Sequence, residues 1–235
     1  MSSFMRYPHL FFDLDHTLWD FERNSRDTLT ELHGDFQFEE RFGFDAHTFL
    51  QTFERINHGL WAQYNVGQIG REEIRKQRFR RVFHALEVPE ASQPQDLGEV
   101  YLSRCPLKPH CMPHTYELLE YLKGKGYRLH IITNGFADVQ AIKMESAKLN
   151  PYFESVVTSE TCGHKKPSPG IFEYALGQVG AETKESLMIG DNLDTDIAGA
   201  AAAQIDQVFY NPEAKSHQHS PTHEVKSLLE LQDFL

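Results

Sequence analysis

Apolar residues follow two different patterns along the chain, and each pattern occupies its own part of it. Short apolar runs of strand length lie at residues 10–12, 127–133, 155–158, 186–190 and 207–210, with helical segments between the later ones. Alternation of this kind is typical of a doubly wound parallel sheet. Between residues 19 and 106, apolar residues recur every three to four positions instead, which is the period of an amphipathic helix. The pattern predicts an α/β fold, with a core formed by 1–18 and 107–235 and an all-helical domain inserted at 19–106.

The expected helices are those in which apolar residues keep the helical period between Gly or Pro residues. In the insert they cover residues 22–33, 49–64, 70–86 and 92–105. In the core they cover residues 113–123, 137–149, 169–179, 195–203 and a closing helix at 225–235.

Charge and cysteine content narrow the classes of function. The chain of 235 residues has 23 Lys and Arg against 34 Asp and Glu, a net charge of -11. So acidic a chain is expected to bind neither nucleic acid nor an anionic membrane, and no apolar run predicts a signal peptide or a membrane span. Cys105, Cys111 and Cys162 are odd in number and lack zinc spacing, which favours reduced thiols in a cytoplasmic protein.

Two carboxylates and a hydroxyl follow the first apolar run. Asp13, Asp15 and Thr17 occupy alternate positions, so in an extended segment their side chains face one side. Ligands of open α/β sheets bind beyond the carboxyl ends of strands. Two carboxylates this close repel each other unless one is protonated or a cation lies between them, and Mg2+ prefers oxygen ligands. The segment alone leaves open an ordinary loop in which Asp caps the next helix.

Three further strand ends carry polar side chains. Thr133-Asn134 ends the second strand, Lys165-Lys166-Pro167 precedes a helix after the third, and Gly190-Asp191 ends the fourth, with Asp194 and Asp196 close behind. Each segment alone could be a turn or a helix cap. Four such segments, each at the end of a strand, favour a common site.

In these segments the sequence resembles the haloacid dehalogenase-like (HAD) hydrolases. The four motifs of that family match Asp13-Leu14-Asp15-His16-Thr17, Thr133-Asn134, Lys166 and the run from Gly190 to Asp196. The resemblance implies a Rossmann-like core with the sheet order 5-4-1-2-3, and it matches the insert to a small helical cap. Residues 13–25, 57–70 and 78–79 are similar to the YjjG-like 5'-nucleotidase branch.

The resemblance, together with charge chemistry, gives roles to the first and last motifs. Asp13 is expected to be the nucleophile that forms an aspartyl-phosphate, and Asp15 the general acid and base. Asp13, Asp191 and the backbone carbonyl of Asp15 are the expected ligands of Mg2+. Asp196 is expected to support the metal site from behind its ligands, with Asp194 as the alternative.

The middle motifs are expected to bind the phosphoryl group. Thr133 and Asn134 would donate hydrogen bonds to it, and Lys166 would neutralise its charge. Lys166 is preferred to Lys165 because the lysine of the family directly precedes the proline. Thr17 is expected beside the site as a supporting residue.

The insert carries the main basic run of the chain, between residues 71 and 81. On a helical wheel, Arg75 and Arg78 fall inside the apolar arc, where a guanidinium needs an acid or a substrate anion as partner. Trp61, on the preceding helix with Asn57, Tyr64 and Asn65 nearby, could contact a nucleobase. A solvated helix face and ordinary core packing are the alternatives for these residues.

The resemblance implies a Mg2+-dependent phosphohydrolase for a small phosphorylated metabolite, with a nucleoside monophosphate as the expected substrate. A sugar-phosphate phosphatase or a phosphomutase would carry the same core motifs. A haloacid dehalogenase is disfavoured because the position of Asp15 is not acidic in those enzymes. A receiver-type signalling module needs neither Asp15 nor a helical insert. The expected assembly is a monomer or a weak homodimer.

Overall fold

The computed structural model of the chain describes residues 5–235 and divides into two compact units. The core unit contains the described residues up to Asp20 together with Pro109–Leu235, and the helical unit is Phe21–Lys108. Both junctions lie two residues later than the predicted bounds of the insert, 19–106.

A six-stranded parallel sheet forms the centre of the core unit, in the order β3-β2-β1-β4-β5-β6. The first five strands have the order that the family resemblance implies, and the predicted fold class is confirmed. β1 is central, and Leu10, Phe11 and Phe12 are fully buried, as expected for a parallel strand covered on both faces. The strands are β1 His9–Phe12, β2 Arg128–Thr133, β3 Ser155–Thr158, β4 Ser186–Gly190, β5 Asp206–Tyr210 and β6 His223–Val225.

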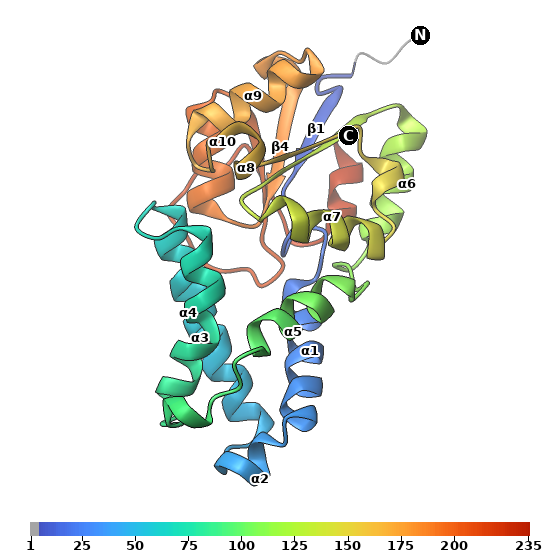
Figure 1. The fold of residues 1–235 in the computed structure, drawn as a ribbon. Coiled ribbons are helices and arrows are strands. Elements are labelled where there is room, and N and C mark those ends of the chain that lie inside the picture. The colour runs from blue at the N-terminus through green and yellow to red at the C-terminus, as the bar shows by residue number, and fades with distance from the viewer. Residues whose placement is uncertain (1–4) are drawn as a thin grey trace. The chain divides into compact units, whose positions relative to one another are not determined.

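Helices cover both faces of this sheet. Figure 1 shows α9 (Pro169–Val179) and α10 (Ala198–Ala202) on one side of β1 and β4, and α6 (Thr115–Lys125) and α7 (Ala137–Ser146) on the other. A short helix, α8 Ser159–Cys162, follows β3. The helix predicted at 195–203 begins as a π-helical turn at Leu193–Ile197 and becomes α-helical only at Ala198.

The C-terminal segment corrects the prediction of a closing helix at 225–235. Val225 is buried in β6, which pairs with β5, and only a 3-10 helix at Leu228–Asp233 follows. The Ser227 side chain accepts a hydrogen bond from the Leu229 amide, and Glu230 completes a capping box. Such a cap marks the first turn of a helix, so the helix starts after Ser227 and has few residues left to extend.

The helical unit contains no strand, as the sequence predicts, and it has five α-helices where four were predicted, because the short helix α2 (Phe38–Phe42) was not expected. Phe38, Phe49, Phe53 and Phe83 are buried at its centre. The helix predicted at 92–105 begins only at Leu97, because Pro94 favours an extended conformation of the residue before it. The helices are α1 Phe21–Asp35, α2 Phe38–Phe42, α3 Ala46–Asn65, α4 Arg71–Ala85 and α5 Leu97–Arg104, with 3-10 turns at Glu90–Ser92 and Cys105–Leu107.

Candidate active site

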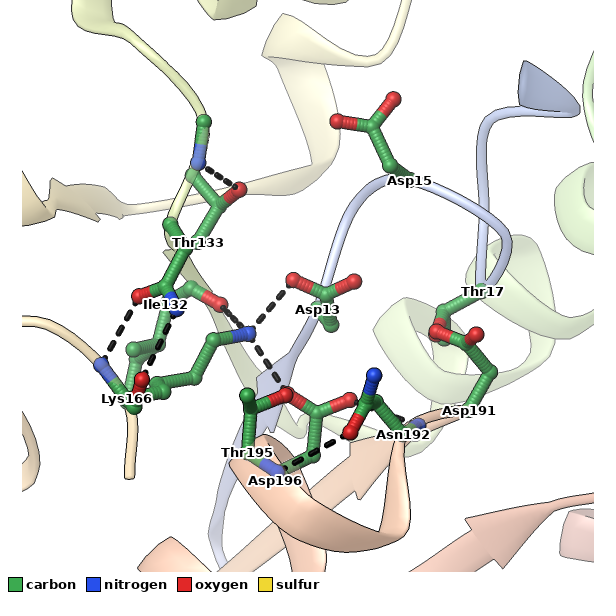
Figure 2. Close-up of polar contacts among 12 residues, drawn as sticks. Asp13, Asp15, Thr17, Ile132, Thr133, Lys166, Asp191, Asn192, Thr195 and Asp196 are labelled. Atoms are coloured by element: carbon green, nitrogen blue, oxygen red, sulfur yellow. Dashed lines mark hydrogen bonds and ion pairs between the residues drawn. The ribbon is translucent and has the colours of Figure 1, made fainter. Parts of the chain in front are cut away.

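The polar segments at the ends of β1, β2 and β4, and the segment before α9, meet at one edge of the sheet (Figure 2). The Asp13 amide donates to the Ile189 carbonyl at 2.9 Å, which extends the β1–β4 pairing to Asp13. Asp13 and Asp191 therefore leave adjacent strands side by side. The order of the strands alone brings these two carboxylates together.

Lys166 is the buried cation of this cluster, with only 2% of its surface exposed. Its Nζ lies 2.6 Å from an Asp13 oxygen and 2.7 Å from an Asp196 oxygen, and it also donates to the Ile132 carbonyl at 2.8 Å. Burial by itself would lower the pKa of Lys166, but the two carboxylates raise it well above its usual value. Lys166 is therefore charged and faces Asp13 directly.

Asn134 holds the backbone of Lys166 in place. Its Nδ2 donates to the Lys166 carbonyl at 2.9 Å, and its Oδ1 accepts from the Lys166 amide at 2.8 Å. A two-way bond of this kind fixes both the position and the direction of the lysine stem. The predicted contact of Asn134 with a phosphoryl group stays a prediction, beside this bracing role.

Asp196, and not the alternative Asp194, lies in the buried cluster. Asp196 is buried beside Lys166, and its second oxygen accepts from the Asn192 amide at 3.1 Å. The Asp194 side chain is 91% exposed. A Cβ on Gly190 would lie 2.2 Å from the Asp196 carboxylate, so a glycine is required there for the π-helical turn to fold Asp196 back toward Lys166.

Asp13, Asp191 and Asp196 each place a carboxylate oxygen within 4.8 Å of the others. Burial raises the pKa of Asp13 to about 8 and that of Asp191 to about 7, and the neighbouring carboxylates add to both shifts. Thr17 donates to Asp191 at 3.1 Å. Three carboxylates share one ammonium, so the cluster carries an excess of negative charge once all three are ionised. Closely spaced oxygen donors with this excess fit a hard divalent cation such as Mg2+.

Asp15 lies outside that group, and two residues that the sequence analysis missed hold it. Lys143 Nζ is 2.6 Å from one Asp15 oxygen, and Gln140 Nε2 donates to the other at 2.8 Å. Burial opposes ionisation, yet these two contacts keep the pKa of Asp15 below its usual value. Both residues are buried in α7, three positions apart. In the sequence, this role is indicated only by two polar residues on the inner face of the helix that follows Thr133-Asn134.

The predicted substrate residues of the insert lie in the helical unit. Arg78 is 5% exposed and lies over the rings of Tyr101 and Phe53, 5.3 and 5.8 Å from their centroids. Arg75 is half-buried, and Trp61 packs edge-to-face on Tyr64 at 5.4 Å. Contact of Arg75, Arg78 and Trp61 with a substrate stays a prediction.

The chain is similar in sequence to a known family of hydrolases. Residues 7–204 match the haloacid dehalogenase-like hydrolases. The chain belongs to that family. It is 33% identical to the pyrimidine 5'-nucleotidase PynA of Streptococcus pneumoniae, over 98% of this chain and 96% of that protein. It is 32% identical to the pyrimidine 5'-nucleotidase YjjG of Escherichia coli, over 98% of this chain and 99% of that one. These relatives confirm the resemblance to the YjjG-like branch, and the chain is a HAD-type phosphatase.

A solved structure of similar fold is the HAD-hydrolase YfnB from Bacillus subtilis bound to magnesium. It superimposes with a TM-score of 0.84 at 28% identity, and the match covers 97% of this chain and 98% of that one. Within residues 5–235, no helix is both long enough and apolar enough to cross a bilayer.

Proposed function

We propose that this phosphatase hydrolyses a small phosphate monoester with Mg2+ as cofactor, through an aspartyl-phosphate on Asp13, and that its substrate is a nucleoside 5'-monophosphate. The observation that carries the mechanism is the pair of contacts that Lys166 makes with Asp13 and Asp196, at 2.6 and 2.7 Å. They leave a nucleophilic carboxylate at the carboxyl edge of the sheet beside a fixed positive charge.

The residues that would hold Mg2+ are Asp13, Asp191 and the backbone carbonyl of Asp15. When bound, the cation would neutralise charge on the phosphoryl oxygens and on the carboxylates. Asp196 is already engaged by Lys166 and by the Asn192 amide, which suits a residue that holds the lysine.

The first chemical step transfers the phosphoryl group to the protein. An Asp13 oxygen attacks phosphorus, and the bond from phosphorus to the ester oxygen breaks. Asp15, whose ionised form Lys143 and Gln140 favour, must take up a proton before this step and then gives it to the departing alcohol. Lys166 balances the negative charge that gathers around the transferring group. Thr133 lies at the end of the adjacent strand β2 and would donate its hydroxyl to a phosphoryl oxygen.

The second step returns the protein to its starting state. A water molecule attacks phosphorus, Asp15 accepts the proton of that water, and the bond between phosphorus and the Asp13 oxygen breaks. Free phosphate and the Asp13 carboxylate result. Asp15 therefore alternates between acid and base.

The choice of substrate rests on the two relatives named as pyrimidine 5'-nucleotidases, which match nearly the whole chain, the helical unit included. A pyrimidine nucleoside 5'-monophosphate is therefore the first substrate to test. A sugar phosphate is the second candidate, since the core motifs do not select the alcohol part of the ester. A phosphomutase is the third, and it would move the phosphoryl group without releasing it.

The test is a phosphate-release screen of the metal-stripped protein, with and without added Mg2+. Pyrimidine and purine nucleoside monophosphates, sugar phosphates and an aryl phosphate would be compared by kcat/KM. We expect release only with Mg2+ and the highest kcat/KM for a pyrimidine nucleotide. Equal release without the metal would contradict the mechanism. A higher kcat/KM for a sugar phosphate would mean that the substrate is a sugar phosphate and not a nucleotide.

A further inference from the structure

The carboxylate of Asp15 is held through both of its oxygens by one helix. Lys143 Nζ lies 2.6 Å from Oδ1, and Gln140 Nε2 lies 2.8 Å from Oδ2. Both residues come from α7 and are almost fully buried, whereas 23% of the Asp15 side chain is exposed. The carboxylate is thus fixed from the protein side and open on the other.

Gln140 also connects Asp15 to the phosphoryl-binding strand end. The same Nε2 that contacts Asp15 donates to Thr133 Oγ1 at 2.9 Å. The amide can have only this orientation, because its Oε1 would repel the Asp15 carboxylate. A Cβ on Gly135 would lie 1.8 Å from Gln140 Nε2, so the glycine after Thr133-Asn134 leaves the space that this side chain occupies.

Lys143 is fixed on its other side by the loop that carries Asp15. Its Nζ lies 4.4 Å from the centroid of the Trp19 ring, and a charge over an indole face is attracted to it. Trp19 is fully buried, and its carbonyl accepts from the His16 amide at 2.9 Å. The loop therefore folds back so that Asp15 and Trp19 both contact the same ammonium.

The buried Gln140 amide lowers the stability of the folded state, which an apolar residue at this position would not do. Its Oε1 is buried and has no hydrogen-bond partner among residues 5–235. A buried carbonyl without a partner destabilises the folded state, and an apolar side chain of similar volume would avoid that loss. Retention of the amide is therefore better explained by what its Nε2 holds.

We propose that Gln140 and Lys143 are positioning residues that set the Asp15 carboxylate, relative to Thr133, where it can exchange a proton with the ester oxygen. This inference rests on the proposed function, in which Asp15 is the acid and base. Gln140 and Lys143 lie in α7, outside the four family motifs, and would act in the protonation of the leaving group. A misplaced acid would slow the step that needs its proton, while the nucleophile and its lysine remain in place.

The test compares two esters that differ in how much they need an acid. p-Nitrophenyl phosphate releases a stable phenolate, whereas the best alkyl ester, such as a nucleoside 5'-monophosphate, releases an alkoxide that must be protonated. Because kcat/KM includes the steps up to the first irreversible one, it reports transfer to Asp13. For Gln140→Met and Lys143→Met we expect kcat/KM to fall roughly tenfold to a hundredfold on the alkyl ester. On the aryl ester we expect a fall of less than about threefold.

Three comparisons separate positioning from folding. Glu145→Gln, on the exposed face of the same helix, should change neither value. Lys143→Arg should recover part of the loss on the alkyl ester. The thermal midpoint of Gln140→Met should stay unchanged or rise, because the substitution removes the unpaired carbonyl. If Lys143→Met does not fold, Gln140→Met carries the test alone.

Equal losses on the two esters, or full activity on both in Gln140→Met, would overturn the assignment. A fall in the midpoint of Gln140→Met that accounts for its lost activity would assign the residue to stability instead. If the unchanged protein released phosphate from neither ester with Mg2+ present, the proposed function itself would fail, which is a different result from either of these.

Discussion

Among residues 5–235, the most deeply buried cation of the core unit is Lys166 and that of the helical unit is Arg78, and the two are balanced in opposite ways. In the core unit, Lys166 has two carboxylates within 2.7 Å and a third carboxylate, Asp191, in the same cluster. In the helical unit, Arg78 lies against aromatic rings, and no carboxylate of residues 5–235 is within ion-pair distance of it. One cluster therefore has too much negative charge, and the other has a positive charge without a counterion.

The pKa shifts follow this difference. The carboxylates raise the pKa of Lys166 although burial opposes them, whereas burial lowers the pKa of Arg78 although Tyr101 and Cys105 oppose it. Arg78 Nε and Asn57 Oδ1 are both buried without a hydrogen-bond partner in the described chain. Buried charges that lack compensation are costly. A cation beside the carboxylates of the core unit, or an anion beside Arg78 in the helical unit, would offset that cost.

Removal of Lys166 should have the largest effect on this balance. Lys166→Met would leave the three carboxylates of the cluster, two of them buried, without a cation, and we expect a loss of about 3–5 kcal/mol in the free energy of unfolding. Lys165→Met, next to it in the chain, should cost less than about 1 kcal/mol. Urea denaturation with and without Mg2+ measures both, and the metal should recover part of the loss in the first variant. Equal losses of unfolding free energy in the two variants would mean that Lys166 does not compensate the charge of the carboxylates.

The excess of negative charge should also make the stability of the metal-free protein depend on pH. Asp13 and Asp191 have pKa values of about 8 and about 7 in the folded protein, above the usual value near 4 of the unfolded chain. The native state therefore binds more protons than the unfolded state between about pH 4 and pH 8, and stability falls as pH rises through that range. We expect the thermal midpoint to decrease from pH 6 to pH 8.

Two changes should reduce this pH dependence. Asp13→Asn takes away the group with the larger shift, and Mg2+ binds deprotonated ligands, so it should stabilise the protein more at pH 8 than at pH 6. A midpoint that rises with pH equally in the metal-free protein and in Asp13→Asn would show that the carboxylates are already balanced.

Arg78 gives the smallest expected effect on stability. Arg78→Met removes a buried charge that has no acid to pair with, and we expect a change of less than about 1 kcal/mol in the free energy of unfolding. If the helical unit binds the substrate anion, KM for the preferred ester should rise while kcat changes little. Arg80→Met, at an exposed position on the same helix, is the control. Lost stability with an unchanged KM would make Arg78 a structural residue.

The sequence predicted those parts of the site that depend on strand order. Asp13 and Asp191 follow apolar strands and Thr133 ends one, and parallel strands bring such residues to one edge whatever the details of packing. The family resemblance added Lys166, whose contact with Asp13 joins segments 153 positions apart. Strand periodicity also gave five of the six strands, while the three-residue β6 was too short to distinguish from the start of a helix.

The sequence could not predict the parts that depend on local geometry. Spacing did not choose between Asp194 and Asp196, because the choice is made by a π-helical turn that only the space above Gly190 permits. Gln140 and Lys143 were missed because their partner Asp15 is 125 positions away from Gln140, in a loop whose return path periodicity does not reveal. Polar residues on a helix are usually solvated, but these two are buried by their tertiary contacts with the Asp15 loop.

The central claim is that Asp13 accepts the phosphoryl group beside Lys166. The most direct measurement is acid quenching of the protein with Mg2+ and substrate during the first turnover, followed by mass spectrometry of its peptides. We predict a phosphoryl group on the peptide that contains Asp13, attached to that residue, and neither label nor phosphate release in Asp13→Asn. A label on another residue, or phosphate release by Asp13→Asn at the rate of the unchanged protein, would contradict the account.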